Sequence, residues 1–141
     1  MKYLMAMLIL LAHQSTFAEI LLGEWKYEEL IYRGNRIPRP DPNLNLTWTF
    51  YLNGTERLYW DRGDMSFCER FARFKYGFEI LSEKVFAVNP DNASDCQKDP
   101  DMQMGRQTHT NLEVRDSEML LHVPLGDEEI IYVLKKVEGN K

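Results

Sequence analysis

Short runs of apolar and aromatic residues, separated by Gly, Pro, Asn and Asp about every dozen residues, follow Gly23 along the chain. No long stretch repeats with the period of about 3.6 residues that an amphipathic helix needs. The pattern therefore predicts an all-β, antiparallel protein. The expected strands lie at about 24–33, 45–52, 55–62, 67–80, 84–89, 107–115, 118–125 and 129–137. Eight strands in a meander can close on themselves, so we expect an eight-stranded up-and-down barrel without exposed edges.

The loop at 52–54 fixes which residues face each other in one hairpin. A two-residue turn would mix apolar and polar side chains on the same face. A three-residue loop with its glycine in the left-handed conformation instead pairs Trp48 with Leu58 and Leu46 with Trp60. This second register keeps one face apolar, and we therefore predict it.

The aromatic side chains of this face are expected to point into the barrel and to contact a ligand. The candidate ligand-binding residues are Trp48, Trp60, Arg70, Phe74, Tyr76 and Phe78. Arg70 shares the parity of the aromatic residues that follow it, so it either points inward, where it suits a ligand carboxylate, or lies at the rim in water. An eight-stranded interior can be filled by side chains or can hold one small ligand, and the sequence leaves both options open.

The two cysteines, Cys68 and Cys96, are expected to form a disulfide bond. A hairpin turn near residues 82–83 would place position 68 opposite about position 97, at the same side of the sheet. The pairing is expected to break down near residues 89–90, which still leaves both thiols close together. The bond would then tie down the long loop at 90–104.

The first 18 residues resemble a secretory leader. A single lysine precedes an apolar stretch from Tyr3 to Ala12, and a short polar segment follows, with Ala18 as the expected last residue removed. About ten apolar residues are too few for a membrane span, which needs roughly 20, so we expect no stable membrane anchor. Residues 19–141 then form one exported domain, periplasmic or extracellular, in which a disulfide can persist.

The charge of the chain argues against nucleic acid as a partner. Without Lys2, 16 of the 17 basic residues remain against 22 acidic ones, a formal charge of −6, and no basic run is interleaved with aromatics. In another hairpin, with its turn at 116–117, we expect Leu112 opposite Leu121 and Val114 opposite Met119 on the inner face. His109 and His122 are then diagonal neighbours on its outer face, without a third histidine or cysteine that would suggest a metal. We expect no metal, no cofactor and no catalytic residue, and therefore not an enzyme.

Gly23 and Trp25 open the first expected strand, and this Gly-x-Trp pattern resembles the signature of the lipocalins. In that family the glycine lets the chain bend into the barrel and the tryptophan closes one end. The resemblance implies a barrel with one open mouth and an apolar ligand inside. The chain lacks the family's Thr-Asp-Tyr motif and the arginine that stacks on the tryptophan, and Lys135 or Lys136 would supply that cation. The closer likeness is to compact, lipocalin-like bacterial domains.

These observations predict an exported binding protein that holds a small apolar or amphipathic molecule inside the barrel. The alternative is a packed barrel that acts as a protein-binding or inhibitory module. Its contacts would then come from the loops at 34–42 and 90–104. The first of these alternates proline with charge, so it is expected to be an extended connection and not a central strand, and it could cover a barrel mouth.

Overall fold

Alternating apolar and polar side chains form nine antiparallel strands in the computed structural model, which describes residues 18–139. The strands are β1 (Gly23–Tyr32), β2 (Asn35–Pro38), β3 (Asn45–Phe50), β4 (Thr55–Asp61), β5 (Phe67–Gly77), β6 (Ile80–Val88), β7 (Gln107–Arg115), β8 (Glu118–Leu125) and β9 (Glu128–Lys136). Two short 3-10 helices, η1 (Ser94–Lys98) and η2 (Pro100–Met102), lie between β6 and β7. The predicted all-β class is confirmed.

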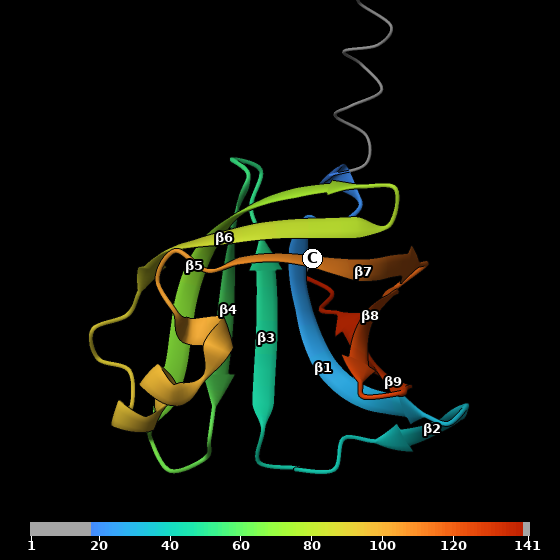
Figure 1. Ribbon diagram of the computed structural model, residues 1–141, viewed down its shortest axis with the longest axis horizontal. Helices are drawn as coiled ribbons and strands as arrows, with labels where there is room; N and C mark the ends of the chain where they lie inside the picture. Colours follow the sequence, from blue (N-terminus) through green and yellow to red (C-terminus); the bar gives the residue numbers. More distant parts are fainter. Residues whose placement is uncertain (1–17, 140–141) are drawn as a thin grey trace, which may run out of the picture.

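The sheet closes on itself (Figure 1). Each strand from β3 to β8 pairs with the next one, and β1 pairs with both β3 and β9. Because the pairing of β1 with β9 runs from Trp25 opposite Lys136 to Tyr32 opposite Ile130, the closure extends along almost all of β1. The closed barrel contains β1 and β3 to β9, which confirms the predicted eight-stranded antiparallel meander.

The segment at 34–42 contains no central strand, as predicted, but part of it forms an edge strand and not only a connection. Residues Asn35 to Pro38 form β2, which pairs with the end of β1 and leaves Tyr32 opposite Asn35. β3 pairs only with the first part of β1, from Gly23 to Lys26. The same edge of β1 is therefore free to pair with β2 between Glu29 and Tyr32. Since Pro38 has no N–H for a sheet ladder, β2 ends there and remains a short edge strand.

Two predicted registers are confirmed. In the β3–β4 hairpin, Leu46 lies opposite Trp60 and Trp48 lies opposite Leu58. The β7–β8 hairpin has Leu112 opposite Leu121, and Val114 opposite Met119. Both hairpins follow the register that keeps one face apolar, as expected for strands with one buried face.

The β5–β6 hairpin turns earlier along the chain than predicted, and the expected inward position of Phe78 is wrong. Gly77 lies opposite Ile80, so the turn consists of Phe78 and Glu79, with φ angles of 52° and 59°. These left-handed angles are those of a tight hairpin turn that matches the twist of the strands. Phe78 is therefore at the tip of the hairpin and is 93% exposed.

The predicted disulfide bond joins Cys68 on β5 to Cys96 on η1, with 5.7 Å between their Cα atoms. β6 ends at Val88, opposite Arg70, so direct strand pairing does not bring the cysteines together. The loop returns to β5 through the backbone N–H of Ala93, which donates to the carbonyl of Phe67 at 3.0 Å. The bond therefore fixes the loop and both 3-10 helices against the barrel.

Trp25 closes one end of the barrel, as the family resemblance implies. Its side chain is fully buried, and its indole N–H donates to the carbonyl of Leu21 at 2.8 Å. The ammonium of Lys136 lies 5.1 Å from the ring centroid and donates to the carbonyl of Leu22. Of the two lysines expected as the cation over this ring, Lys136 takes the position.

Replacing Gly23 by alanine is expected to destabilise this closed end. Gly23 has a φ of 109°, and an added Cβ would lie 3.3 Å from Cε of Lys136. We expect Gly23→Ala to lower the free energy of unfolding by about 1–3 kcal/mol, measured by chemical denaturation. Gly34→Ala is the matched control, because Gly34 also has a positive φ but no atom within 4 Å of the added Cβ. A Gly23→Ala loss no larger than that of the control would contradict the steric part of this account.

The expected leader at 1–18 falls almost entirely outside the described residues. The described helices include none that is long and apolar enough to cross a membrane.

Candidate ligand-binding cavity

The barrel interior is filled at one end by aromatic side chains. The rings of Phe50 and Phe74 meet edge to face with 4.9 Å between their centroids, and Trp48 lies 5.0 Å from Phe50. Tyr76 donates its hydroxyl to the carbonyl of Leu112 at 2.7 Å. Phe74 and Tyr76, expected to contact a ligand, therefore belong to this packed end and do not border open space.

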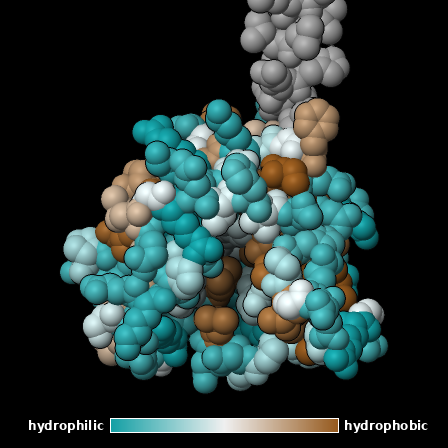
Figure 2. Space-filling model, viewed as in Figure 1, coloured by the Kyte–Doolittle hydropathy of each residue, from teal (hydrophilic) through white to brown (hydrophobic). Residues whose placement is uncertain are grey.

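A cavity of about 1180 Å³ occupies the other end. Its apolar wall includes Trp48 and Trp60 with Leu46 and Leu58 from β3 and β4. Figure 2 shows the hollow from outside, with hydrophobic side chains inside it and a hydrophilic rim around it. The sequence left open whether the interior is filled by side chains or can hold a ligand. The interior is packed at one end and hollow at the other.

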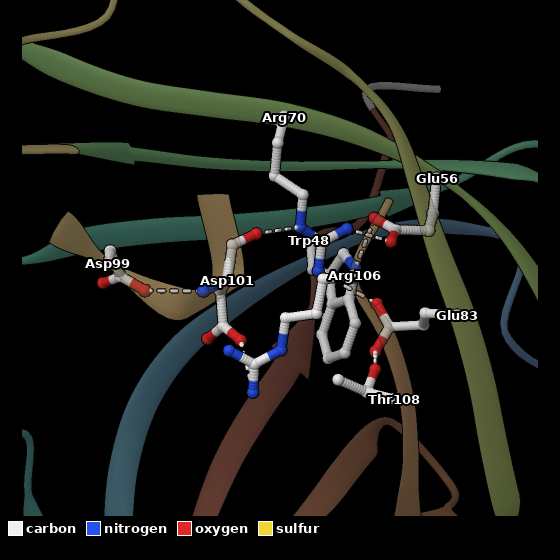
Figure 3. Close-up of polar contacts among 8 residues, drawn as sticks. All are labelled: Trp48, Glu56, Arg70, Glu83, Asp99, Asp101, Arg106 and Thr108. Atoms are coloured by element: carbon white, nitrogen blue, oxygen red, sulfur yellow. Dashed lines mark hydrogen bonds and ion pairs between the residues drawn. The ribbon is translucent and has the colours of Figure 1, made fainter. Parts of the chain in front are cut away.

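Arg70 points into the barrel from β5, where two carboxylates hold its guanidinium group (Figure 3). It forms ion pairs with Glu56 and with Glu83, the latter at 3.0 Å, and its Nε donates to the carbonyl of Asp101 at 3.0 Å. Its side chain is 5% exposed, so of the two positions considered for Arg70 the structure has the inward one.

Further hydrogen bonds satisfy the carboxylates of this cluster. The indole N–H of Trp48 donates to Glu56 at 2.7 Å, and the hydroxyl of Thr108 donates to Glu83 at 3.1 Å. Arg70, Glu83 and Trp48 line the cavity, whereas Glu56 lies behind them. The cluster gives the cavity a polar patch on an otherwise aromatic and aliphatic wall.

Burial and mutual charge shift the pKa values in this cluster. Burial raises the pKa of Glu56 well above its usual value, with Arg70 opposing the shift and Glu83 adding to it. Burial by itself would lower the pKa of Arg70, but the charges of Glu56 and Glu83 outweigh it and raise that pKa. Arg70 is thus a permanent cation between two acidic groups, and a ligand carboxylate would have to compete with both.

The mouth of the cavity is bordered by loops from two parts of the chain. Asp41 from the loop after β2 and Asp99 with Asp101 from the disulfide-linked loop line it. Arg62 and Arg106 line it as well, each beside a carboxylate. Residues of both loops that the sequence suggested for a protein-binding role therefore border the cavity.

His109 and His122 have the predicted relative position, since Asn111 lies opposite His122 on the β7–β8 hairpin. Both histidines also border the open part of the cavity. The ring of His122 lies 2.8 Å from both Glu113 and Glu129. Burial lowers the pKa of His122, but these two carboxylates outweigh it, so that the pKa is raised.

Two residues that line the cavity, Tyr27 and Glu83, and one that lies behind its wall, Glu56, were not predicted from the sequence. Glu56 shares the parity of Leu58 and Trp60, so a charged residue on an apolar face was a visible signal. Glu83 was hidden because the turn was expected at its position. Tyr27 shares the parity of Trp25 on β1 and lines the cavity.

No family model matches the chain, and no curated protein matches it. A lipocalin-like protein from Bacteroides uniformis ATCC 8492 has a similar structure, with a TM-score of 0.55 and 14% identity, over 84% of this chain and 99% of that chain. An uncharacterized protein from Bacteroides eggerthii DSM 20697 is also similar, with a TM-score of 0.53 and 17% identity, over 83% of this chain and 99% of that one. Together with the closed eight-stranded meander, these similarities show that the chain has a lipocalin-like barrel fold.

Proposed function

We propose that this protein binds one small apolar or amphipathic molecule inside its barrel, without converting it chemically. The observation that carries the proposal is the cavity of about 1180 Å³ with two tryptophans and two leucines in its wall. Ligand pockets are typically concave, mostly apolar and provided with a few convergent polar groups. The Arg70–Glu83 pair with Thr108 supplies such groups at one place in the wall.

We further propose that the protein acts outside the cytoplasm. The leader-like sequence at 1–18 supports export, and the disulfide bond between Cys68 and Cys96 is compatible with it. The loops considered for a protein-binding role border the cavity through Asp41 and Asp101. A bound small molecule would contact both loops, so their position at the cavity supports ligand binding.

A neutral naphthylamine dye tests the binding proposal. We expect its fluorescence to rise with saturable, one-to-one stoichiometry, because the dye leaves water for an aromatic cavity. Thr110→Trp should weaken this binding about tenfold, since Thr110 lines the cavity and the larger side chain occupies ligand space.

Thr49→Trp is the matched control, because Thr49 is half-buried on β3 and does not line the cavity. The control should bind the dye like the unmodified protein. Dye fluorescence that rises linearly without saturation, or equal loss of binding in both variants, would reject the proposal.

A further inference from the structure

β7 and β8 pair with each other along only part of their length. The pairing stops at Asn111, which lies opposite His122. Beyond this point residues 107–110 of β7 pair with β6, and residues 123–125 of β8 pair with β9. Figure 1 shows the two strands diverging from their shared turn. The barrel wall therefore has a gap between two strands that are each held in place on their other side.

This gap opens into the cavity. Thr110 borders it from β7, Val123 and Pro124 border it from β8, and all three residues line the cavity. Thr110 has the same parity as Leu112, which is buried in the core, so the side chain of Thr110 points into the barrel. A ligand in the cavity would therefore lie against the backbone edge of β7.

The backbone of His109 presents a donor and an acceptor to the gap. Successive residues of an antiparallel strand direct their N–H and C=O groups to opposite edges. The N–H of Leu112 donates to the carbonyl of Glu79, at the turn before β6, so the even-numbered residues of β7 face β6. The odd-numbered residues face β8, and the N–H and C=O of His109 therefore point toward the gap.

β8 does not use these two groups, because the residue in register with His109 is Pro124. Proline has no N–H to donate to the carbonyl of His109. A bond from the N–H of His109 to the carbonyl of Pro124 would add Thr110 opposite Val123 to the ladder, and the ladder lacks this pair. Among the described residues, no other group bonds to either one, since the hydrogen bond of His109 to Ser82 is made by the ring. Both backbone groups are therefore left for a ligand.

An amino-acid unit offers the complementary pair of groups. In an antiparallel ladder, the N–H and C=O on either side of one α-carbon exchange two hydrogen bonds with the residue opposite. An acylated amino acid has this arrangement within a small molecule. A single trans amide does not, because its N–H and C=O point in opposite directions. Extended peptides bind to free strand edges through the same pair of bonds.

We propose that the gap between β7 and β8 binds an acylated amino-acid unit, and that the ligand is an apolar acyl chain that carries such a unit. The N–H of the unit donates to the carbonyl of His109, and its following carbonyl accepts from the N–H of His109. The acyl chain extends into the cavity, whose wall includes Trp48 and Trp60. This inference rests on the proposed function, because it names the class of molecule that the cavity holds.

Two uncharged ligands that differ in one group test the inference. N-decanoylglycine methylamide has the N–H that the carbonyl of His109 would accept from. Decanoylglycolic acid methylamide has an ester oxygen at the same place, which leaves that carbonyl without a donor. We expect the first to displace the neutral dye at a concentration about three- to tenfold lower than the second. Isothermal titration calorimetry gives the same order independently of the dye.

Variants of His109 test the assignment to this residue. His109→Pro removes the N–H that faces the gap but no bond between β6 and β7, a change that an edge position tolerates. We expect the affinity for N-decanoylglycine methylamide to fall about three- to tenfold and the affinity for decanol to stay unchanged. His109→Ala is the matched control, because it removes the ring and keeps the N–H. It should bind both ligands like the unmodified protein.

Pro124→Ala tests the same edge from β8, and it serves if His109→Pro does not fold. It supplies an N–H opposite the carbonyl of His109, so β8 can pair with β7 in place of the ligand. We expect it to weaken the binding of N-decanoylglycine methylamide several-fold, again without an effect on decanol.

The outcomes separate this inference from the proposed function. Equal affinities for the two decanoyl compounds would overturn the amino-acid unit as the recognised group, while binding in the cavity stands. An affinity for the methylamide that falls no more than that for decanol, in His109→Pro and in Pro124→Ala, would overturn the assignment to this edge. If the dye, decanol and both decanoyl compounds fail to bind, the proposed function itself fails.

Discussion

Replacement of Arg70 by methionine is expected to lower the free energy of unfolding by about 3–5 kcal/mol at neutral pH. Methionine retains much of the apolar volume but removes the guanidinium group between Glu56 and Glu83, whose side chains are 0% and 7% exposed. These carboxylates would then be buried without their cation, which is far costlier than the loss of an exposed ion pair. Equilibrium denaturation in urea measures the difference directly.

The loss should depend on pH in a defined direction. The pKa of Glu56 is already raised in the folded protein above its ordinary value of 4.5. A carboxyl group whose pKa is higher in the folded state contributes stability that is present below its unfolded pKa and is lost as the pH rises through its folded pKa. Without Arg70 the folded pKa should rise further, so the deficit of Arg70→Met should shrink as the pH falls toward 4.5.

Arg57→Met is the matched control for this prediction. Arg57 pairs with Glu69, but its side chain is 31% exposed, so the loss should stay near or below about 1 kcal/mol. Equal losses in the two arginine variants, or a deficit in Arg70→Met that does not change with pH, would show that the buried cluster is not held together by charge.

Loss of the disulfide bond is expected to lower the free energy of unfolding by about 3–4 kcal/mol, from the entropy of closing a loop between cysteines 28 positions apart. The variant Cys96→Ser tests this by denaturation, and the double variant with Cys68→Ser should be no less stable than the single one. An unchanged unfolding midpoint in both would mean that the bond does not stabilise the folded protein.

Intact mass of the unreduced protein from its producing cell should show the bond and a chain that begins at Glu19.

The parts of the barrel that were predicted correctly are those in which each strand has one apolar face. Trp48 opposite Leu58 and Leu112 opposite Leu121 follow from alternation together with turn length. A slip of one residue would have turned every apolar side chain outward, so the pattern leaves one acceptable register. The closing Trp25 was also predictable, because its Gly-x-Trp motif is local in sequence.

The β5–β6 turn could not be found in this way. Phe78 and Glu79 both adopt left-handed angles, a conformation that turn sequences normally assign to Gly, Asn or Asp. Strand pairing on both sides imposes the turn, and this tertiary effect overrides the local preference. Because the turn was expected at Glu83, this residue was not predicted to point into the barrel. The ionic cluster of Glu56, Arg70 and Glu83, which come from three different strands, was therefore not predicted either.

The pairing of β1 with β9 also orders the events of folding. Trp25 meets Lys136 across nearly the whole described chain, so this contact closes a very long loop. Contacts between such distant residues form slowly compared with those of hairpins, which are local. Without the pairing of β1 with β9, the same strands would form an open sheet with unpaired edges and no enclosed space. The ability to hold a ligand therefore depends on the contact that is most distant in the sequence.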